Sequence, residues 1–234
     1  MITREQFWLM TDQARLEAEY MVDEKLEYLQ NVPLEVLQEI CLQYRYFTES
    51  YPDTLGILIS KTPPGKFKSL IAEILSEELG SGNAEAAHLK IWDNFLISLG
   101  VNEDRLEISA DTNNVNLLKE LMQLTKDRST AYAIGLRGMG GECLCQVYLT
   151  AMHKNMLNNS YIKMNDSNID WTFWDIHVGE ADIIHNQMVR QAINEMVDAV
   201  PTRINDLAAG YHKAKQSWDI FWNNIYNSAL VKQA

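Results

Sequence analysis

The sequence predicts an all-α protein, a single-domain bundle of about seven to nine helices. Five prolines and eleven glycines in 234 residues leave long stretches unbroken, and helical periodicity dominates these stretches. No run of alternating polar and apolar residues suggests a strand, and no internal repeat or low-complexity linker divides the chain. A chain of this length can bury a sizeable core, so we expect one domain covering residues 1–234.

Capping residues and prolines define the first helices. Thr3, with a glutamine three residues later, predicts a capping box that opens a helix over residues 3–30. Pro33 starts the second helix. We expect this helix to stop near Pro52, because proline disfavours helical geometry in the residue before it, and to resume over residues 53–60.

The remaining helices are bounded by glycine, asparagine and proline. Gly100 is a suitable C-cap for the helix before it. The run Gly138-Met139-Gly140-Gly141 interrupts a longer helical stretch, which therefore forms one or two helices. Pro201 ends the long helix that precedes it. The helices expected in this part of the chain cover residues 67–79, 84–99, 115–157, 169–200 and 202–230.

The composition is that of an ordinary globular protein and excludes several classes of function. A net charge of −12 and a pI near 4.8 argue against nucleic acid or an anionic membrane as a partner. No apolar run reaches the ~18 residues needed to span a bilayer, and no secretory signal opens the chain. The three cysteines, Cys41, Cys143 and Cys145, are too few for a disulfide scaffold, so we expect a reducing cytoplasm.

The most informative motif is His177-x4-Asp182-x2-His185. Asp182 and His185 are three residues apart and share a helix face. His177 and His185 are eight apart and differ by about 80° around an ideal helix. A π-type bulge at Gly179 would restore their alignment. Glu180 is the competing carboxylate, and Asp182 is preferred because it serves both histidines if the helix is bulged.

Two further polar residues lie in apolar surroundings. His88 belongs to an alanine-rich apolar segment, where a buried imidazole needs a partner. Glu142 lies in an apolar run, where a carboxylate must be paired, protonated or bound to a cation. Imidazole and carboxylate together suit non-haem iron or manganese, and helical bundles form such sites from inward-pointing side chains. We therefore predict a di-metal site, although each histidine alone fits a partly buried position on an amphipathic helix.

The chain resembles the haem-oxygenase-like di-iron oxidases and oxygenases over roughly residues 34–225. The likeness is carried by Glu77-Glu78-Leu79-Gly80-Ser81-Gly82, the histidine at 88, the mid-chain glutamate at 142 and the late His-Asp-His motif. It implies a haem-oxygenase-like fold. The metal ligands that it implies are Glu78, His88, Glu142, His177, Asp182 and His185.

The late motif departs from the family pattern, because four residues rather than the usual three separate His177 from Asp182. Because of this departure, Glu180 remains an alternative to Asp182 as the ligand. Some members of the family use a glutamate from the first core helix, for which Glu49 is the candidate here. Glu85, three residues before His88, is a further alternative.

The resemblance also implies cofactors and chemistry. Two Fe(II) ions would react with O2, with an external electron donor, to oxidise a small amino-acid-like substrate. One reaction of the family, conversion of a (halogenated) tryptophan to an indole nitrile, is a candidate. Arg137 could neutralise a substrate carboxylate, and Gly138 and Gly141 would either leave a substrate cavity beside Glu142 or permit close helix packing. A homodimer is left open.

Two alternatives remain at this point. The same fold occurs in metal-free thiaminase-like and quinone-cofactor-maturation enzymes, and a thiaminase-type reaction would use Cys143 as nucleophile beside a carboxylate. A non-enzymatic interaction protein could use its acidic surface as an interface. Such a scaffold would gain little from burying histidines and carboxylates.

Overall fold

The computed structural model describes residues 2–107, 111–178 and 180–231, without the side chains of 180–186 and 229–231. These residues form helices, turns and loops and contain no strand, which confirms the all-α prediction. Three short helices are α6 (Thr130–Ala133), α8 (Ser160–Asn165) and α9 (Thr172–His177). The long helices are α1 (Arg4–Leu26), α2 (Leu34–Lys61), α3 (Lys66–Glu78), α4 (His88–Ser98), α5 (Thr112–Asp127), α7 (Glu142–Met156), α10 (Glu180–Ala199) and α11 (Ile204–Val231).

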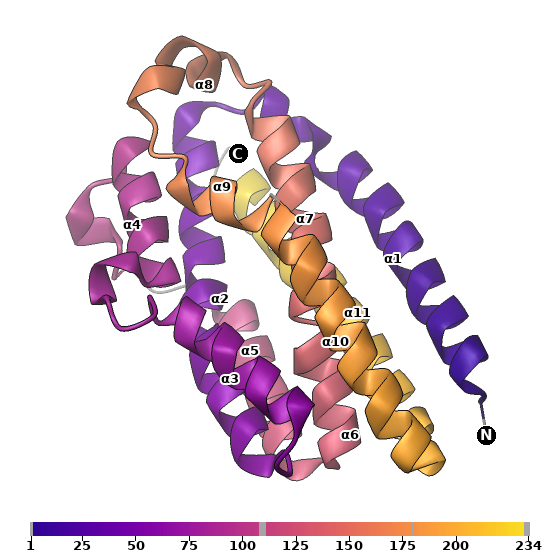
Figure 1. The fold of residues 1–234 in the computed structure, drawn as a ribbon. Helices are drawn as coiled ribbons and strands as arrows, with labels where there is room; N and C mark the ends of the chain where they lie inside the picture. Colours follow the sequence, from indigo (N-terminus) through magenta and orange to yellow (C-terminus); the bar gives the residue numbers. More distant parts are fainter. Residues whose placement is uncertain (1, 108–110, 179, 232–234) are drawn as a thin grey trace.

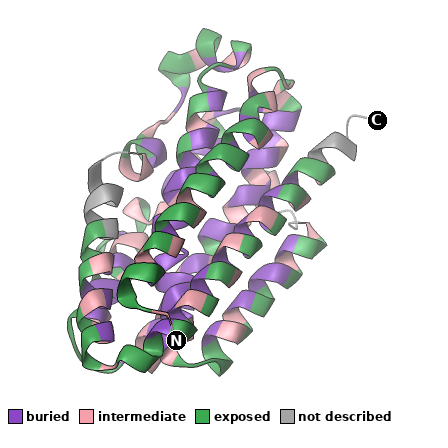
Figure 2. Cartoon of the chain, turned by 90° about the vertical axis from the view of Figure 1, so that its right-hand side faces the viewer, coloured by how far each residue is buried: buried purple, intermediate pink, exposed green. Residues whose placement is uncertain are grey.

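Helix α2 occupies the centre of the bundle and packs against α3, α4, α5 and α11. In Figure 1, α3 and α4 lie on one side of the bundle, α1 runs along the other, and α10 crosses the front. Helix α1 packs on α7 and α11. The inward faces of the helices are buried and their outward faces exposed (Figure 2), the pattern expected of amphipathic helices around one apolar core.

Capping residues act as the sequence predicts at several helix ends. The Thr3 hydroxyl accepts a hydrogen bond from the Gln6 amide, and the Gln6 side chain accepts one from the Thr3 amide, which completes the capping box. Gly100 follows α4 with a φ of 87°, a left-handed conformation that glycine adopts without strain.

The expected break at Pro52 does not occur, and α2 runs through this residue without interruption. A proline in a helix interior removes one backbone hydrogen bond and costs about 3 kcal/mol or more. The helix continues because the residues beyond Pro52 extend its buried face: Leu55 and Leu58 are fully buried in the core. Burial of each such side chain contributes roughly 1.5–3 kcal/mol, which offsets the cost of the proline.

The long helix expected over residues 169–200 is instead two helices. Helix α9 ends at His177, and α10 begins at Glu180. A π-bulge within one continuous helix is therefore the wrong description, and Gly179 itself lies outside the described residues. A π-helix does occur elsewhere, over Ile134–Met139, directly before α7.

Glycines of the π-helix and α11 allow their backbones to meet. A Cβ atom on Gly135 would lie 2.1 Å from the carbonyl oxygen of Leu207, and one on Gly210 would lie 2.1 Å from that of Tyr132. A Cβ on Gly140 would collide with the Cβ of Ala214 at 2.1 Å. Close helix packing therefore explains these glycines. For Gly140, which belongs to the glycine-rich run, it was one of the two interpretations left open.

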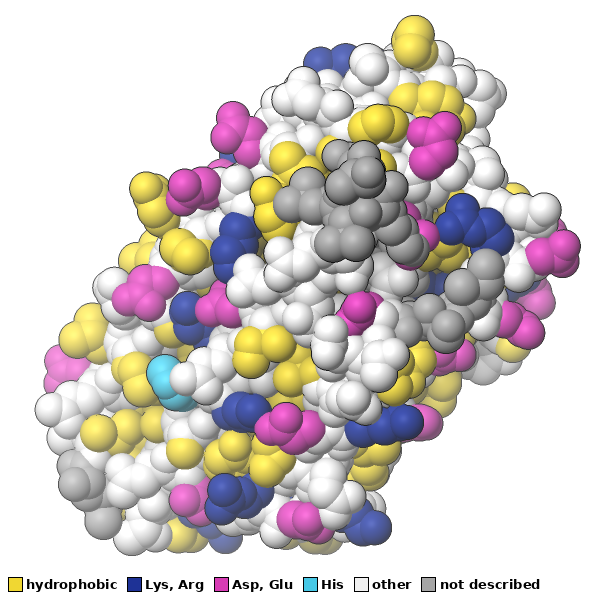
Figure 3. Space-filling view, turned by 180° about the vertical axis from the view of Figure 1, so that it is seen from behind, with side chains coloured by type: hydrophobic (Ala, Val, Ile, Leu, Met, Phe, Trp, Pro, Cys, Tyr) yellow, Lys and Arg dark blue, Asp and Glu magenta, His cyan; other side chains and the backbone are white. Residues whose placement is uncertain are grey.

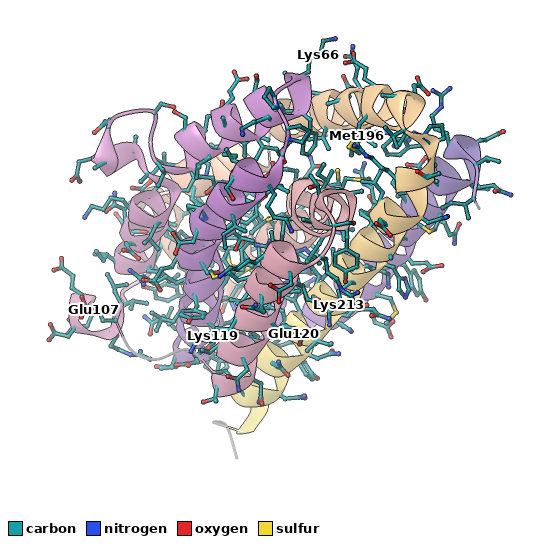
Figure 4. All side chains as sticks on the ribbon, turned by 90° about the horizontal axis from the view of Figure 1, so that it is seen from below. Lys66, Glu107, Lys119, Glu120, Met196 and Lys213 are labelled. Carbon is teal, nitrogen blue, oxygen red and sulfur yellow. The ribbon has the colours of Figure 1, made fainter. Side chains whose placement is uncertain are left out.

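Ion pairs between helices lie on the outside of the bundle. Lys213 of α11 contacts Glu120 of α5 at 2.7 Å, and Lys66 of α3 contacts Glu195 of α10 at 2.6 Å; Figure 4 labels Lys213, Glu120 and Lys66. Exposed pairs of this kind contribute little, about 0–1 kcal/mol each. No helix among the described residues combines the length and apolar character needed to cross a membrane.

Candidate metal site

A sharp turn between α3 and α4 brings Glu78 and His88 together. Glu78 is the last residue of α3, and His88 is the first of α4. Between them Gly80, Ser81 and Gly82 have φ values of 82°, 50° and 91°, a left-handed run that favours glycine. A Cβ on Gly80 would lie 2.1 Å from the carbonyl oxygen of Asn83, so this position requires glycine. The turn folds the chain back and places the imidazole beside the carboxylate.

Three potential ligand atoms converge beside this turn. Nδ1 of His88 lies 3.0 Å from Oε2 of Glu78, and both side chains are only 12% exposed. His177 joins them from the end of α9, with its ring 4.6 Å from that of His88. One ligand atom from each of these three residues lies within 4.8 Å of the other two. Such spacing is compatible with a single metal ion bound between them.

The backbone fixes the state of His177. Its Nδ1 lies 2.7 Å from the carbonyl oxygen of Phe173, an acceptor, so we assign the proton to Nδ1 and the free lone pair to Nε2. A metal-binding histidine is commonly oriented in this way, by a hydrogen bond from the ring nitrogen that does not bind the metal. Burial lowers the pKa of His177 to about 4, and the neighbouring charge of His88 adds to this effect. The ring is thus neutral at pH 7, as a ligand must be.

His88 provides the observation that tests whether a metal fits. Its Nδ1 is buried, and within the described part of the chain it makes no hydrogen bond of acceptable geometry, despite the 3.0 Å approach of Glu78. Side chains that bind one ion point at a common centre and need not hydrogen-bond each other. Burial opposes protonation of His88, but the adjoining Glu78 and the charge of Glu142 outweigh it and raise its pKa. The donor set therefore fits a cation that replaces this proton.

Glu142 reaches the same cavity from the start of α7. The hydroxyl of Tyr51, on α2, donates a hydrogen bond to its carboxylate. Burial and the charge of Glu142 raise the pKa of Tyr51 well above its usual range, so the phenol keeps its proton. A Cβ on Gly141 would lie 2.3 Å from the Tyr51 hydroxyl. Glycine at 141 therefore makes room for the hydrogen bond between Tyr51 and Glu142.

These residues surround a cavity of about 360 Å³. Its wall combines acidic and imidazole side chains with aromatic rings. The residues that form it include Glu77, Glu78, His88, Gly141, Glu142, Cys145 and His177, together with Tyr44, Phe47, Thr48, Tyr51, Ile74, Phe173 and Ile176.

Residues 38–219 match the model of a haem-oxygenase-like family described as iron-containing redox enzymes. The chain belongs to this family. No curated protein matches the sequence. The family model spans all of the helices that supply the converging side chains, so the imidazole–carboxylate cluster lies within the part of the chain that defines this iron-containing family.

Solved structures share the fold at low sequence identity. A CADD-like protein of unknown function from Nostoc punctiforme PCC 73102 has a TM-score of 0.79 and 18% identity, covering 96% of this chain and 99% of that one. A domain of unknown function with a heme oxygenase-like fold from Shewanella denitrificans OS217 has a TM-score of 0.71 and 14% identity, and the match covers 98% of this chain and 93% of that one. A TenA homolog from Pseudomonas syringae pv. tomato str. DC3000 has a TM-score of 0.71 and 11% identity, and the match covers 96% of this chain and 92% of that one. These likenesses establish a haem-oxygenase-like fold.

Not every residue proposed from the sequence reaches the cavity of this family member. Glu49 is 47% exposed and lies 3.8 Å from Arg45 on the surface of α2, and Glu85 is exposed in the turn before α4. Both alternatives fail because they point away from the bundle interior. The side chains of Glu180, Asp182 and His185 lie outside the described residues.

Arg137 and Gly138 also lie away from the cavity wall. Arg137 is buried behind Tyr51, with its guanidinium carbon 5.0 Å from the centre of the Tyr51 ring. A Cβ on Gly138 would lie 2.8 Å from the Phe67 ring, which places this glycine in the packing between helices. Of the three substrate-binding residues expected, only Gly141 lines the cavity.

The cysteine expected as nucleophile faces the wrong side of α7. Cys143 lines a separate small cavity of about 20 Å³ beside Tyr211, and burial raises its pKa to about 12. Cys145, two residues further on, lines the main cavity, with its sulfur 3.4 Å from the Tyr44 hydroxyl. Residues two apart on a helix point in directions that differ by about 200°, so Cys145 faces the main cavity and Cys143 does not.

Tyr51 and Thr48 are two polar cavity residues that the sequence did not predict. Both lie on α2, in the turn just before Pro52, and reach the site because α2 packs against the π-helix Ile134–Met139 that precedes α7. The available signal was the spacing of Tyr44, Thr48 and Tyr51, four and seven residues apart on one helix face. That spacing also fits an ordinary core stripe.

Proposed function

We propose that the protein is an O2-dependent, non-haem di-iron oxidase or oxygenase that acts on a small amino-acid-type metabolite. The observation that carries the proposal is the convergence of Glu78, His88 and His177 at the wall of a cavity. Membership of an iron-containing redox family supports iron as the metal. Imidazole and carboxylate ligands are those expected for non-haem iron.

Each ion has its own candidate ligands. Glu78, His88 and His177 would hold one iron. Glu142, which faces the same cavity, would bind both ions, and we propose Asp182 and His185, which the resemblance implies as ligands, for the second. When bound, ferrous iron supplies the electrons for reaction with O2, while the protein supplies ligands, orientation and an enclosed cavity.

The protein's own residues prepare the site in three ways. The Phe173 carbonyl holds the proton of His177 on Nδ1 and leaves Nε2 free. Tyr51 orients the carboxylate of Glu142 and keeps a hydroxyl proton beside it. The rings of Tyr44, Phe47 and Phe173 limit the access of water to the reacting centre.

The substrate class is a finer part of the proposal. A cavity of about 360 Å³ falls at the lower end of the range for small-molecule sites, roughly 300–1,000 Å³. The family resemblance suggests amino acids as the substrates. Conversion of a (halogenated) tryptophan to an indole nitrile is the specific reaction to test. An external electron donor, a cytoplasmic location and a homodimer complete the proposal.

The two alternatives gain no support from the site. The metal-free reaction assigned to Cys143 would need this thiol in the main cavity, from which it is turned away. An acidic interface would need segregated charge, but on the face shown in Figure 3 acidic and basic side chains are interspersed. The enzyme proposal therefore stands as the one supported by geometry.

Anaerobic titration with Fe(II) tests the metal centre directly. Two iron ions per chain should bind to the wild-type protein, and His88→Ala should lose stoichiometric loading while keeping its helical circular dichroism. His212→Ala, at an exposed position on α11, is the matched control and should load normally. Full loading of His88→Ala would refute the ligand assignment.

Mixing the loaded protein with O2 and a panel of amino acids, tryptophans included, then tests the substrate class by mass spectrometry.

A further inference from the structure

Thr48 lies in the cavity wall and carries a buried hydroxyl without a hydrogen-bond partner among the described residues. The residue is 5% exposed and lines the cavity wall. Within the described part of the chain its Oγ1 has no hydrogen-bond partner. Buried polar groups without a partner are rare in folded proteins, and each calls for an explanation such as a bound ligand or water.

Other buried threonines of this protein satisfy their hydroxyls within the helix. The hydroxyls of Thr54, Thr62 and Thr125 donate to the carbonyl oxygen four residues earlier, at 3.1, 2.8 and 2.7 Å. Thr48 occupies the same kind of position on α2 but makes no such bond. Its hydroxyl is therefore left free for a group inside the cavity.

Aromatic rings surround this hydroxyl. Tyr44 and Tyr51 lie four residues before and three residues after Thr48 on the same face of α2. Phe47 is its neighbour in sequence, and all three aromatic residues line the same cavity. The Phe47 ring is stacked on both tyrosines, with centroids 5.7 Å from Tyr44 and 5.5 Å from Tyr51. Packed rings form a rigid surface that suits a planar apolar ligand.

The charge of the wall restricts the ligand further. None of the described residues that line the cavity is lysine or arginine, whereas Glu77, Glu78 and Glu142 are acidic. The sequence of residues 179–186, whose side chains the structure does not describe, also contains no lysine or arginine. The imidazole of His88 is already paired with Glu78 at 3.0 Å. A ligand carboxylate would find no lysine or arginine on this wall, so the group that meets Thr48 is uncharged or cationic.

We propose that Thr48 is a substrate-binding residue: it hydrogen-bonds an uncharged or cationic polar group of an aromatic substrate whose ring lies against Tyr44, Phe47 and Tyr51. This inference rests on the proposed function only in taking the cavity as the active site. Thr48 takes the role in substrate selection that the sequence suggested for Arg137. It selects the substrate by a hydrogen bond rather than by a salt bridge.

A two-by-two binding experiment tests the role of the hydroxyl. Tryptophol and 3-ethylindole share an indole ring and differ by one hydroxyl group, and Thr48→Val removes the partner hydroxyl while keeping the side-chain shape. Calorimetric titration of the anaerobic ferrous protein should show tryptophol binding weakened about five- to tenfold by Thr48→Val. The affinity for 3-ethylindole should change by less than about twofold, because it has no hydroxyl to lose.

Thr54→Val is the matched control, since Thr54 is buried on the same helix but bonded to the Ser50 carbonyl. It should leave both affinities unchanged. Equal losses for the two ligands with Thr48→Val would show a packing effect and overturn the proposal. Failure of tryptophol to bind the wild-type protein, or binding that does not respond to Thr48→Val, would overturn it as well.

The charge inference has its own comparison. Indole-3-propionate and tryptamine carry opposite charges on similar side chains, and the metal-free protein should bind indole-3-propionate at least tenfold more weakly than tryptamine. Equal binding would contradict the inference. Iron content is measured separately on the same samples, so a protein that binds no iron but retains the Thr48-dependent binding of tryptophol would refute the proposed function and leave this inference standing.

Discussion

Tyr51 connects the candidate metal site to a buried cation. Its hydroxyl donates to Glu142, and its ring lies under the guanidinium of Arg137, which is 3% exposed. Burial lowers the pKa of Arg137, against the opposing influence of Tyr51 and nearby acidic groups. A guanidinium keeps its charge even so, and the aromatic face and the nearby carboxylate help to compensate for its burial. Arg137 thus acts on the site through Tyr51.

Removing the Tyr51 hydroxyl should weaken iron binding without disturbing the fold. Tyr51→Phe retains the ring and its packing but removes the hydroxyl that donates to Glu142. Loss of such an orienting contact typically costs 10–100-fold in metal affinity, and we expect a loss in this range from competition with a chelator of known affinity. Tyr20→Phe, at a position 75% exposed, is the control. Equal affinities in Tyr51→Phe and wild type would exclude the orienting role.

Acid should destabilise the metal-free protein through His177. Its pKa is about 4 in the folded state and about 6.5 in the unfolded chain. The unfolded chain therefore takes up the proton first, so the stability is fully present above about pH 6.5 and is lost as the pH falls towards 4. His88, with a raised pKa, acts in the opposite direction.

Comparison with His177→Asn isolates this contribution. Between pH 7 and pH 5 the wild type should lose roughly 1–2 kcal/mol more of its free energy of unfolding than the variant does. Urea denaturation at the two pH values measures both quantities. Parallel losses in the two proteins would show that His177 is not buried in its neutral form.

At the scale of helices, local sequence signals predict some features and miss others. His88 and Glu142 were identifiable because a polar residue in an apolar run must have a partner. The continuation of α2 through Pro52 was not, because the core contacts that sustain it come from other helices. Glu49 and Glu85 share the chemistry of the proposed ligands, and only packing shows that they face outward. Tyr51 meets a residue 91 positions away, which no local pattern reveals.

Two glycine substitutions should have opposite effects on stability. Gly56 lies within α2, and a Cβ there would meet nothing within 4 Å, so Gly56→Ala should stabilise the protein by up to about 1 kcal/mol. Gly135→Ala would place a Cβ 2.1 Å from the backbone oxygen of Leu207 and should destabilise by about 1–3 kcal/mol or more. Urea denaturation measures both changes. A stable Gly135→Ala variant would contradict the close packing of the π-helix on α11.

For the whole molecule, the candidate metal site joins segments that are far apart in the chain. Glu78 and His88 belong to the turn between α3 and α4, His177 ends α9, and Glu142 starts α7. Helix α9 is only six residues long, too short to be stable alone, and Phe173, Trp174 and His177 attach it to the rest. An ion held by these residues would therefore stabilise the arrangement of all four segments together.

Iron should accordingly raise the thermal stability of the protein. A ligand at 100 times its dissociation constant adds about 2.7 kcal/mol to the free energy of unfolding. For a chain of this size that corresponds to a rise in Tm of roughly 5–10 °C. Anaerobic thermal unfolding with and without Fe(II) measures the rise, and a chelator should reverse it. His88→Ala should lose the increment, whereas His212→Ala should keep it. An equal rise in the His88 variant would place the stabilising ion elsewhere, because binding at this cluster requires the imidazole that the variant lacks.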